Sequence, residues 1–342
     1  MNVRTASGGL ITLAIVLLAA CSGGDPEPKK DAPSEVPAGT IVFRRFLDDQ
    51  QQQAALFTMS TDGKNERQIT KPPDYSIDSF PDWSPDGKRV VFHREFTDRP
   101  YEVHMVNADG SDEHQVKPGR PPIGPADALS EAAEPAWSHD GKTLAFSWAF
   151  GKLEQVRGEE WIEVGGIATM SVDGSKAKQV TQTKRPTTSE DGTVTWSPDG
   201  RQIAYTRENK TDRPFDGSAI FVSNSDGSDA KRVTPWELAG QEPSWSPDGT
   251  LLSFRSEPTG EDFIGEIYTV KPDGSDVTQL TRAKGKQVFS MSFSPDSGWI
   301  VFGMEGVDHL PDLFAMRRDG SDLTPLTRTS EWESAPDWSP AD

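Results

Sequence analysis

The side chains that could do chemistry in this 342-residue chain are few and scattered. No two of its histidines have a metal-ligand spacing such as H-E-x-x-H; they are His93, His104, His114, His139 and His309. His309 lies beside Asp308 in an expected loop, where the two could act as an acid–base pair. This pattern is too weak to predict catalysis, so we expect a protein that is not an enzyme, with no catalytic residue, no metal and no cofactor.

Two runs rich in Asn, Asp, Gly and Ser resemble the start of a calcium-binding loop, at residues 107–112 and 224–229. An EF-hand loop requires a bidentate Glu at its twelfth position. That position holds Pro118 in the first run and Pro235 in the second. We therefore interpret both runs as hairpin turns of the Asp-Gly kind.

The only cysteine, Cys21, follows a short apolar segment. Residues 1–20 contain a single charged side chain and an apolar run at 10–20, which is typical of a secretory signal peptide and too short to cross a hydrocarbon core of about 30 Å. The sequence Leu-Ala-Ala-Cys at 18–21 resembles the lipobox of bacterial lipoproteins. That resemblance implies cleavage before Cys21 and attachment of lipid to its sulfur; the alternative is an ordinary signal peptide with an incidental cysteine.

Residues 21–38 combine the lipidated cysteine with a Pro-, Gly- and charge-rich stretch, for which we predict a disordered tether. The lipoprotein resemblance implies an exported protein anchored to a membrane through Cys21. In a Gram-negative cell this would be the periplasmic side of the outer membrane, and otherwise the outer leaflet of the cell membrane. The net charge of −19 disfavours binding to nucleic acid, because phosphates would be repelled.

The part of the chain after the tether is organised by a repeat, W-S-P-D-G, which is intact or modified at six places. Its first residues are spaced 54, 59, 49, 48 and 45 residues apart and are Trp83, Trp137, Trp196, Trp245, Phe293 and Trp338. A period near 45 that is built from short strands predicts the four-stranded blade of a β-propeller. We expect the repeat aromatics to pack between blades and the S-P-D-G residues to form tight turns.

One repeat shows the expected blade: strands at 80–84, 89–93, 101–106 and 114–116, joined by S-P-D-G and Asp-Gly turns. The N-terminal end has only the last three of these strands, at 41–43, 56–59 and 68–70. The C-terminal end has only the first, at 336–339. Together they complete a blade, so the sequence predicts an all-β, six-bladed propeller over residues 39–342, closed by strands from both termini.

These repeats resemble those of TolB-like propellers, the WSPDG variety also found in prolyl-oligopeptidase-like proteins, over residues 40–342. The resemblance implies a protein partner in the cell envelope, such as a peptidoglycan-associated lipoprotein. Two features differ from the family. A tether and lipobox replace the α/β domain that precedes the TolB propeller, and we find no G-x-S-x-G nucleophile motif of a hydrolase.

Successive turns of a meander alternate between faces, so the short S-P-D-G and Asp-Gly turns share one face and the long connections share the other. The largest of these connections spans residues 149–166. Exposed Trp and Arg are common at interfaces, and the candidate partner-binding residues are Glu159, Glu160, Trp161, Arg213, Phe215, Trp236, Asp308, His309 and Trp332. The alternative for each aromatic is a half-buried cap on its blade.

We predict a monomeric propeller that binds an envelope protein through this variable face and acts as a scaffold module. The alternative is a carbohydrate-binding or carbohydrate-active propeller, because similar propellers in oligogalacturonate lyases use His and a metal. Three or more convergent histidines at the channel mouth would favour the lyase.

Overall fold

The computed structural model describes residues 35–117, 129–151, 163–181, 189–209, 217–257, 265–283, 285–306 and 309–340. The predicted signal peptide, Cys21 and most of the predicted tether lie outside these ranges. The chain from Glu35 onward forms one compact unit. Among the described residues, no helix has the length and apolar character that crossing a membrane requires.

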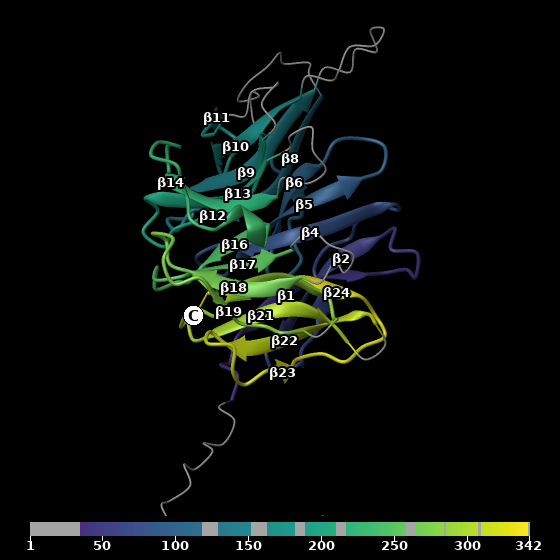
Figure 1. Ribbon diagram of the computed structural model, residues 1–342. Coiled ribbons are helices and arrows are strands. Elements are labelled where there is room, and N and C mark those ends of the chain that lie inside the picture. The colour runs from purple at the N-terminus through teal and green to yellow at the C-terminus, as the bar shows by residue number, and fades with distance from the viewer. Residues whose placement is uncertain are drawn as a thin grey trace, which may run out of the picture. The chain divides into compact units, whose positions relative to one another are not determined.

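The described residues form blades of four antiparallel strands, and two of these blades are joined into one eight-stranded sheet. Figure 1 shows the arrangement of the strands. The first strands of the blades are β4 (Ser76–Trp83), β8 (Leu129–Trp137), β12 (Ser189–Trp196), β16 (Gly240–Trp245), β20 (Val288–Phe293) and β24 (Glu333–Trp338). The second strands are β5 (Arg89–Phe96), β9 (Thr143–Gly151), β13 (Gln202–Asn209), β17 (Leu252–Ser256), β21 (Trp299–Glu305) and β1 (Thr40–Phe46).

The third strands are β6 (Glu102–Asn107), β10 (Glu163–Ser171), β14 (Ser218–Asn224), β18 (Glu266–Val270), β22 (Pro311–Arg317) and β2 (Ala54–Ser60). The fourth, two-residue strands are β7 (His114–Gln115), β11 (Lys178–Gln179), β15 (Lys231–Arg232), β19 (Thr278–Gln279), β23 (Thr324–Pro325) and β3 (Arg67–Gln68). The 3₁₀ helix η1 (Trp236–Leu238) precedes β16. We number the blades 1 to 6 in these orders, and blade 6 is β24-β1-β2-β3.

The two ends of the chain share blade 6, as predicted. β24 pairs with β1 in antiparallel register, with Ile41 opposite Trp338 and Arg45 opposite Glu333. In Figure 1 the yellow β24 accordingly lies beside β1. A single parallel bridge between Ala54 and Ile77 also joins blade 6 to blade 1. The all-β six-bladed propeller closed by both termini is confirmed.

The repeat aromatics pack between neighbouring blades, which confirms their predicted role. Trp137 belongs to blade 2 and contributes to a buried cluster with Val91 and Met105 of blade 1 and Phe146 of its own blade. Corresponding clusters surround Trp83, Trp196, Trp245, Phe293 and Trp338. Each junction between blades therefore has its own apolar core. Burial of these aromatic side chains is the main force that holds neighbouring blades together.

The S-P-D-G turns form the tight geometry that their sequence predicts. In blade 1 the N–H of Gly87 donates to the carbonyl of Ser84 at 2.8 Å, and Gly87 has a φ of 64°. The Ser84 hydroxyl donates to Asp86 at 2.7 Å and accepts the N–H of Arg89 at 2.9 Å. Blade 5 has Ser297 at the glycine position with a φ of 60°. We call the end of the propeller that carries these turns the turn face, and the opposite end the loop face.

Several strands extend further toward the loop face than the sequence predicts. β4 begins at Ser76 rather than Phe80, and β8 begins at Leu129, eight residues before the repeat aromatic Trp137. β9 and β10 continue as a paired ladder to Gly151 opposite Glu163, which shortens the predicted excursion at 149–166. Ladder hydrogen bonds between neighbouring strands outweigh the weak strand pattern of these segments.

Candidate functional site

The first strand of each blade has a β-bulge near its middle, shown by a register shift against the second strand of the blade. In five blades the third residue before the repeat aromatic has a left-handed backbone, with φ between 39° and 52°; these residues are Phe80, Glu134, Thr193, Glu242 and Ala335. A positive φ is unfavourable for residues other than glycine, and most of all for a β-branched residue such as Thr193. Bulges re-aim side chains, and here they line the propeller axis.

The bulge residues and the two residues after each of them enclose a central channel of about 100 Å³. Small-molecule pockets usually measure about 300 to 1,000 Å³, and a water molecule takes up about 30 Å³ of liquid. The described part of the channel is therefore smaller than a typical small-molecule pocket. Its lining includes four carboxylates, Asp82, Glu134, Glu242 and Asp337.

Asp82 and Asp337 connect successive blades inside the channel. Asp337 accepts the backbone N–H of Trp83 at 2.8 Å and the hydroxyl of Ser292 at 2.6 Å. Asp82 accepts the backbone N–H of Trp137 at 2.6 Å. Burial raises the pKa of Asp337 to about 6. Burial, together with the charge of Asp337, also raises the pKa of Asp82 well above its ordinary value.

Glu134 and Glu242 project from their bulges with different partners. The Glu134 carboxylate accepts the backbone N–H of Thr193 in blade 3 at 2.6 Å, and burial raises its pKa. Glu242 is paired with Arg255 at 3.1 Å, and Arg255 also contacts Glu257 at 3.1 Å. The negative charge of Glu242 raises the pKa of the Arg255 guanidinium. Blade 4 thus neutralises its channel carboxylate, whereas Glu134 relies on the backbone N–H of Thr193 and on the Ser147 side chain.

Arg44 adds a positive charge between blades 6 and 1. Its guanidinium donates to the hydroxyls of Ser79 at 2.9 Å and Ser334 at 2.7 Å. Burial lowers the pKa of Arg44, while the charges of Glu95 and Glu242 act in the opposite direction. Arg44 therefore lies in the electrostatic field of Glu95 and of the channel residue Glu242, while the hydrogen bonds of its guanidinium go to neutral hydroxyls.

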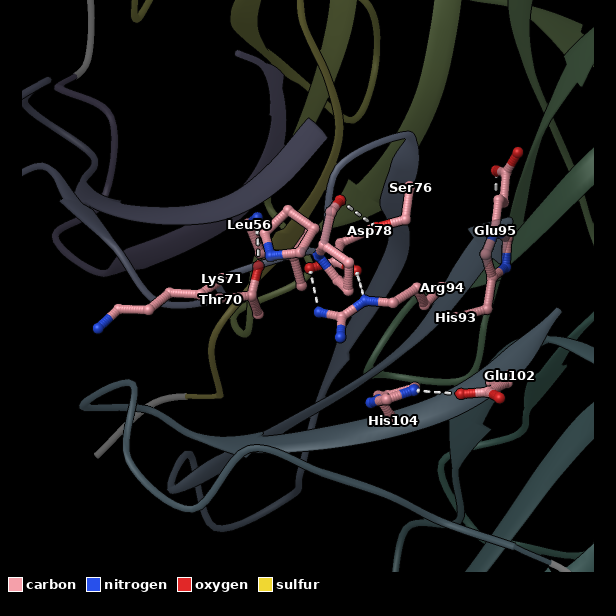
Figure 2. Close-up of polar contacts among 12 residues, drawn as sticks. Leu56, Thr70, Lys71, Ser76, Asp78, His93, Arg94, Glu95, Glu102 and His104 are labelled. Carbon is pink, nitrogen blue, oxygen red and sulfur yellow. Dashed lines mark hydrogen bonds and ion pairs between the residues drawn. The ribbon is translucent and has the colours of Figure 1, made fainter. Parts of the chain in front are cut away.

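Buried ion pairs fasten the first strand of a blade to its second strand on the loop-face side of the bulge. Figure 2 shows the pair in blade 1, where Arg94 donates to both oxygens of Asp78 at 2.5 and 2.8 Å. Arg94 also contacts Glu113 at 2.7 Å. The same spacing gives Arg207 with Asp191 in blade 3 and Arg45 with Glu333 in blade 6. The carboxylate of each pair is fully buried, and the pairs of blades 1 and 3 are bidentate, so these contacts are rigid supports of the channel wall.

The structure places three of the predicted partner-binding residues, and they do not meet in one site. Trp236 packs at 5.9 Å on Phe221 and lies under Arg232. Trp332 packs between Phe46 and Phe289, with ring centroids 6.0 and 5.5 Å away. Both tryptophans are half-buried, which is the capping arrangement considered as the alternative.

His309 is exposed and contacts Glu305 at 2.8 Å. Its predicted partner Asp308 lies outside the described residues, as do Glu159, Glu160, Trp161, Arg213, Phe215 and Cys21. The histidines of the described ranges are spread over β5, β6, β7, a turn and a loop. Within those ranges, no group of three or more His, Cys, Asp and Glu side chains could hold a metal ion.

The channel lining was not predicted from the sequence. The position three residues before each repeat aromatic holds Phe, Glu, Thr, Glu, Ser and Ala in the six blades, so residue type gives no common signal. A usable signal was the fixed spacing itself, because residues at one repeat position share one place in the fold. Charged residues at that position, Glu134 and Glu242, would then have pointed to the axis.

Comparisons with known proteins agree with this architecture. The chain is 25% identical over 139 residues to the uncharacterized peptidase YuxL of Bacillus subtilis, a match that covers 31% of this chain and 20% of that relative. The chain therefore spans only about a fifth of the length of that curated relative.

Solved structures share the fold at low sequence identity. TolB from Acinetobacter baumannii superposes with a TM-score of 0.63 and 18% identity, over 89% of this chain and 67% of that one. An oligogalacturonate lyase from Vibrio parahaemolyticus gives 0.51 and 13%, over 82% and 73%. The family model described as the TolB beta propeller domain matches residues 154–342, more than half of the sequence. The chain therefore belongs to the TolB beta propeller domain family.

Proposed function

We propose that this protein is a lipid-anchored propeller of the cell envelope that binds a partner protein through its loop face. The observation that carries this proposal is the position of the N-terminal segment. The Thr61 hydroxyl donates to the Pro37 carbonyl at 2.8 Å, and the Thr61 N–H donates to the Gly39 carbonyl at 3.0 Å. Thr61 follows β2 in a turn of the turn face, so the chain leaves the propeller at that end.

A tether from Cys21 would therefore join the turn face and leave the loop face free for a partner. The composition of the two faces agrees with this division. Turns of the turn face are short and repeated from blade to blade, whereas loop-face connections differ in length and sequence. The narrow channel favours recognition by surface loops over enclosure of a small substrate. By family resemblance, a peptidoglycan-associated lipoprotein is one such partner.

Exposed apolar side chains on both faces allow a direct test. Leu47 and Tyr75, 41% and 62% exposed, lie on the loop face, and Val277 and Leu323, 37% and 53% exposed, lie on the turn face. A photo-crosslinking amino acid placed at each position in intact cells should give a protein adduct from Leu47 or Tyr75. The matched positions Val277 and Leu323 should give none. Adducts from the turn face alone would contradict the proposal.

The anchor is tested separately with Cys21→Ser. We expect this variant to leave the membrane fraction while keeping its fold, as judged by circular dichroism. A variant that stays with the membrane would show that lipid on Cys21 is not the anchor.

A further inference from the structure

His93 connects the second strand of blade 1 to the first strand of blade 2. Its Nδ1 accepts the backbone N–H of Glu134 at 3.0 Å, and its Nε2 lies 3.0 Å from Glu95 Oε1. The ring is 3% exposed and packs between Phe80 and Tyr101, with centroids 5.3 and 5.7 Å away. Figure 2 shows His93 and Glu95 on one side of β5, and Arg94 pointing to the other side.

The two contacts define the protonation state of the ring. A backbone N–H can only donate, so Nδ1 must carry a lone pair. The proton of the neutral ring is then on Nε2 and is donated to Glu95. In an imidazolium both nitrogens carry protons, and Nδ1–H would face the Glu134 N–H as donor against donor. Protonation of His93 is therefore incompatible with this contact between blades.

The residue held by His93 is a strained bulge residue. Glu134 has a φ of 51°, and its carboxylate in turn holds the N–H of Thr193, which has a φ of 39°. Residues in such conformations persist only while their surroundings enforce them. Loss of the contact to His93 removes one of the restraints on the backbone conformation of Glu134. Because the Glu134 carboxylate binds the N–H of Thr193, the conformation of Thr193 is affected as well. Both residues line the channel.

The charged groups near His93 come from several strands. Glu95 is on its own strand, and β8 contributes Glu134 and Glu131, which both act on Tyr101. Arg44 of β1 lies in the field of Glu95, and Glu242 of β16 in that of Glu134. On β4 and β6 the residues opposite His93 are the neutral Ser79 and Val103. Among these neighbours of His93, carboxylates outnumber cations.

Blade 3 contains the same contact without a titratable acceptor. There the backbone N–H of the bulge residue Glu242 donates to the hydroxyl of Thr206 at 3.2 Å. Thr206 and His93 each follow the buried aromatic of the second strand, Tyr205 and Phe92. The hydrogen-bond acceptor at this position therefore recurs in the architecture. Of blades 1 and 3, only blade 1 has a histidine there.

We propose that His93 is a proton-operated latch on the channel lining. The neutral ring holds the bulge of blade 2 against blade 1, and the protonated ring releases it, so the channel wall at Glu134 and Thr193 rearranges in acid. The latch controls the shape of the loop-face side of the channel independently of which partner binds there.

Nuclear magnetic resonance of the full, lipid-bearing chain in detergent, with ¹⁵N in His, Glu and Thr, tests the latch between pH 8 and 5. At pH 8 the His93 ring should be the neutral tautomer with its proton on Nε2. The amide signals of Glu134 and Thr193 should move with one midpoint, which is that of the His93 ring. The Glu242 amide should show no transition at that midpoint. A ring protonated on Nδ1 at pH 8, or amides that stay still while the ring titrates, would overturn the proposal.

His93→Asn sharpens the test, because the Asn side-chain oxygen can accept the same N–H and does not titrate. In this variant the transition of the Glu134 and Thr193 amides should disappear. His104→Asn is the matched control: His104 also contacts a carboxylate, Glu102, at 2.9 Å, and packs on Phe92. Its buried Nδ1 has no hydrogen-bond partner among the described residues, so the transition should persist. Persistence in His93→Asn would refute the latch.

Discussion

Carboxylates in the turns and in the channel are held in opposite ways. On the turn face, Asp86 accepts a hydroxyl and a backbone N–H in an exposed turn, and these hydrogen bonds lower its pKa. In the channel four residues earlier, burial raises the pKa of Asp82, and Asp337 behaves in the same way. Asp86 is thus stabilised as an anion, whereas Asp82 and Asp337 are held where ionisation is unfavourable.

The comparison extends to sequence. The turns repeat one Ser-to-Asp hydrogen bond in blades 1 to 5, because the tight turn admits few solutions. In five blades the bulges repeat one backbone geometry, while the side chains at that position are Phe, Glu, Thr, Glu and Ala. We infer that the turn end maintains the fold and that the channel and loop end are free to acquire function.

The largest expected effect comes from removing residues 335–342, which deletes most of β24. Blade 6 then loses its first strand, and the cluster around Trp338 is opened. We expect loss of cooperative unfolding of the whole propeller, measured by differential scanning calorimetry. An unchanged melting temperature would show that the terminal strand does not close the ring.

Trp137→Ala tests the packing between blades. The ring is 5% exposed, and removing a buried Trp should lower the free energy of unfolding by about 3 to 5 kcal/mol. Urea denaturation measures the change. Leu323→Ala, on the exposed turn face, is the control and should change stability by less than about 0.5 kcal/mol.

Asp337→Asn tests the contrast between the two kinds of carboxylate. The pKa of Asp337 is about 6 in the folded protein, above the unfolded value of about 3.9. Its protonated form therefore stabilises the fold below about pH 4, and this contribution is lost as the pH rises through about 6. Relative to Asp337→Asn, the wild type should lose on the order of 1 to 3 kcal/mol between pH 4 and 7.

Asp86→Asn is the counterpart with the opposite sign. The folded pKa of Asp86 is lowered, so its contribution is present above the unfolded pKa and is lost as the pH falls. Denaturation at a series of pH values distinguishes the two. Parallel pH profiles for both variants would contradict the division between turn and channel carboxylates.

Thr193→Gly tests strain at the bulges and has the smallest effect. A β-branched residue at a φ of 39° is strained by about 1 to 3 kcal/mol, and glycine removes that strain at an entropic cost of about 0.5 to 1 kcal/mol. We expect a gain of about 1 kcal/mol in the free energy of unfolding. Ser290→Gly, at the same position of blade 5 but without a positive φ, should instead lose stability.

The repeat period and the turn residues made the architecture predictable. Five W-S-P-D-G-like turns and one truncated copy gave the number of blades, and the missing strands at the two ends gave the closure. The bulges were not predictable, because they arise from the register between two strands, and Phe80 and Thr193 are ordinary strand residues by type. Trp236 and Trp332 were recognisable as loop-face aromatics, but only tertiary contacts with Phe221 and Phe289 decide how far they are buried.

The division between faces is tested most directly by labelling introduced cysteines in the cell envelope. Cys21 is the only native cysteine, so Tyr75→Cys and Leu323→Cys each add one thiol at a known face. We predict that a membrane-impermeant maleimide labels Tyr75→Cys slowly in intact envelopes and rapidly in the purified protein, because a partner covers the loop face. Leu323→Cys should react at the same rate in both. Protection of Leu323→Cys with full exposure of Tyr75→Cys would contradict the account.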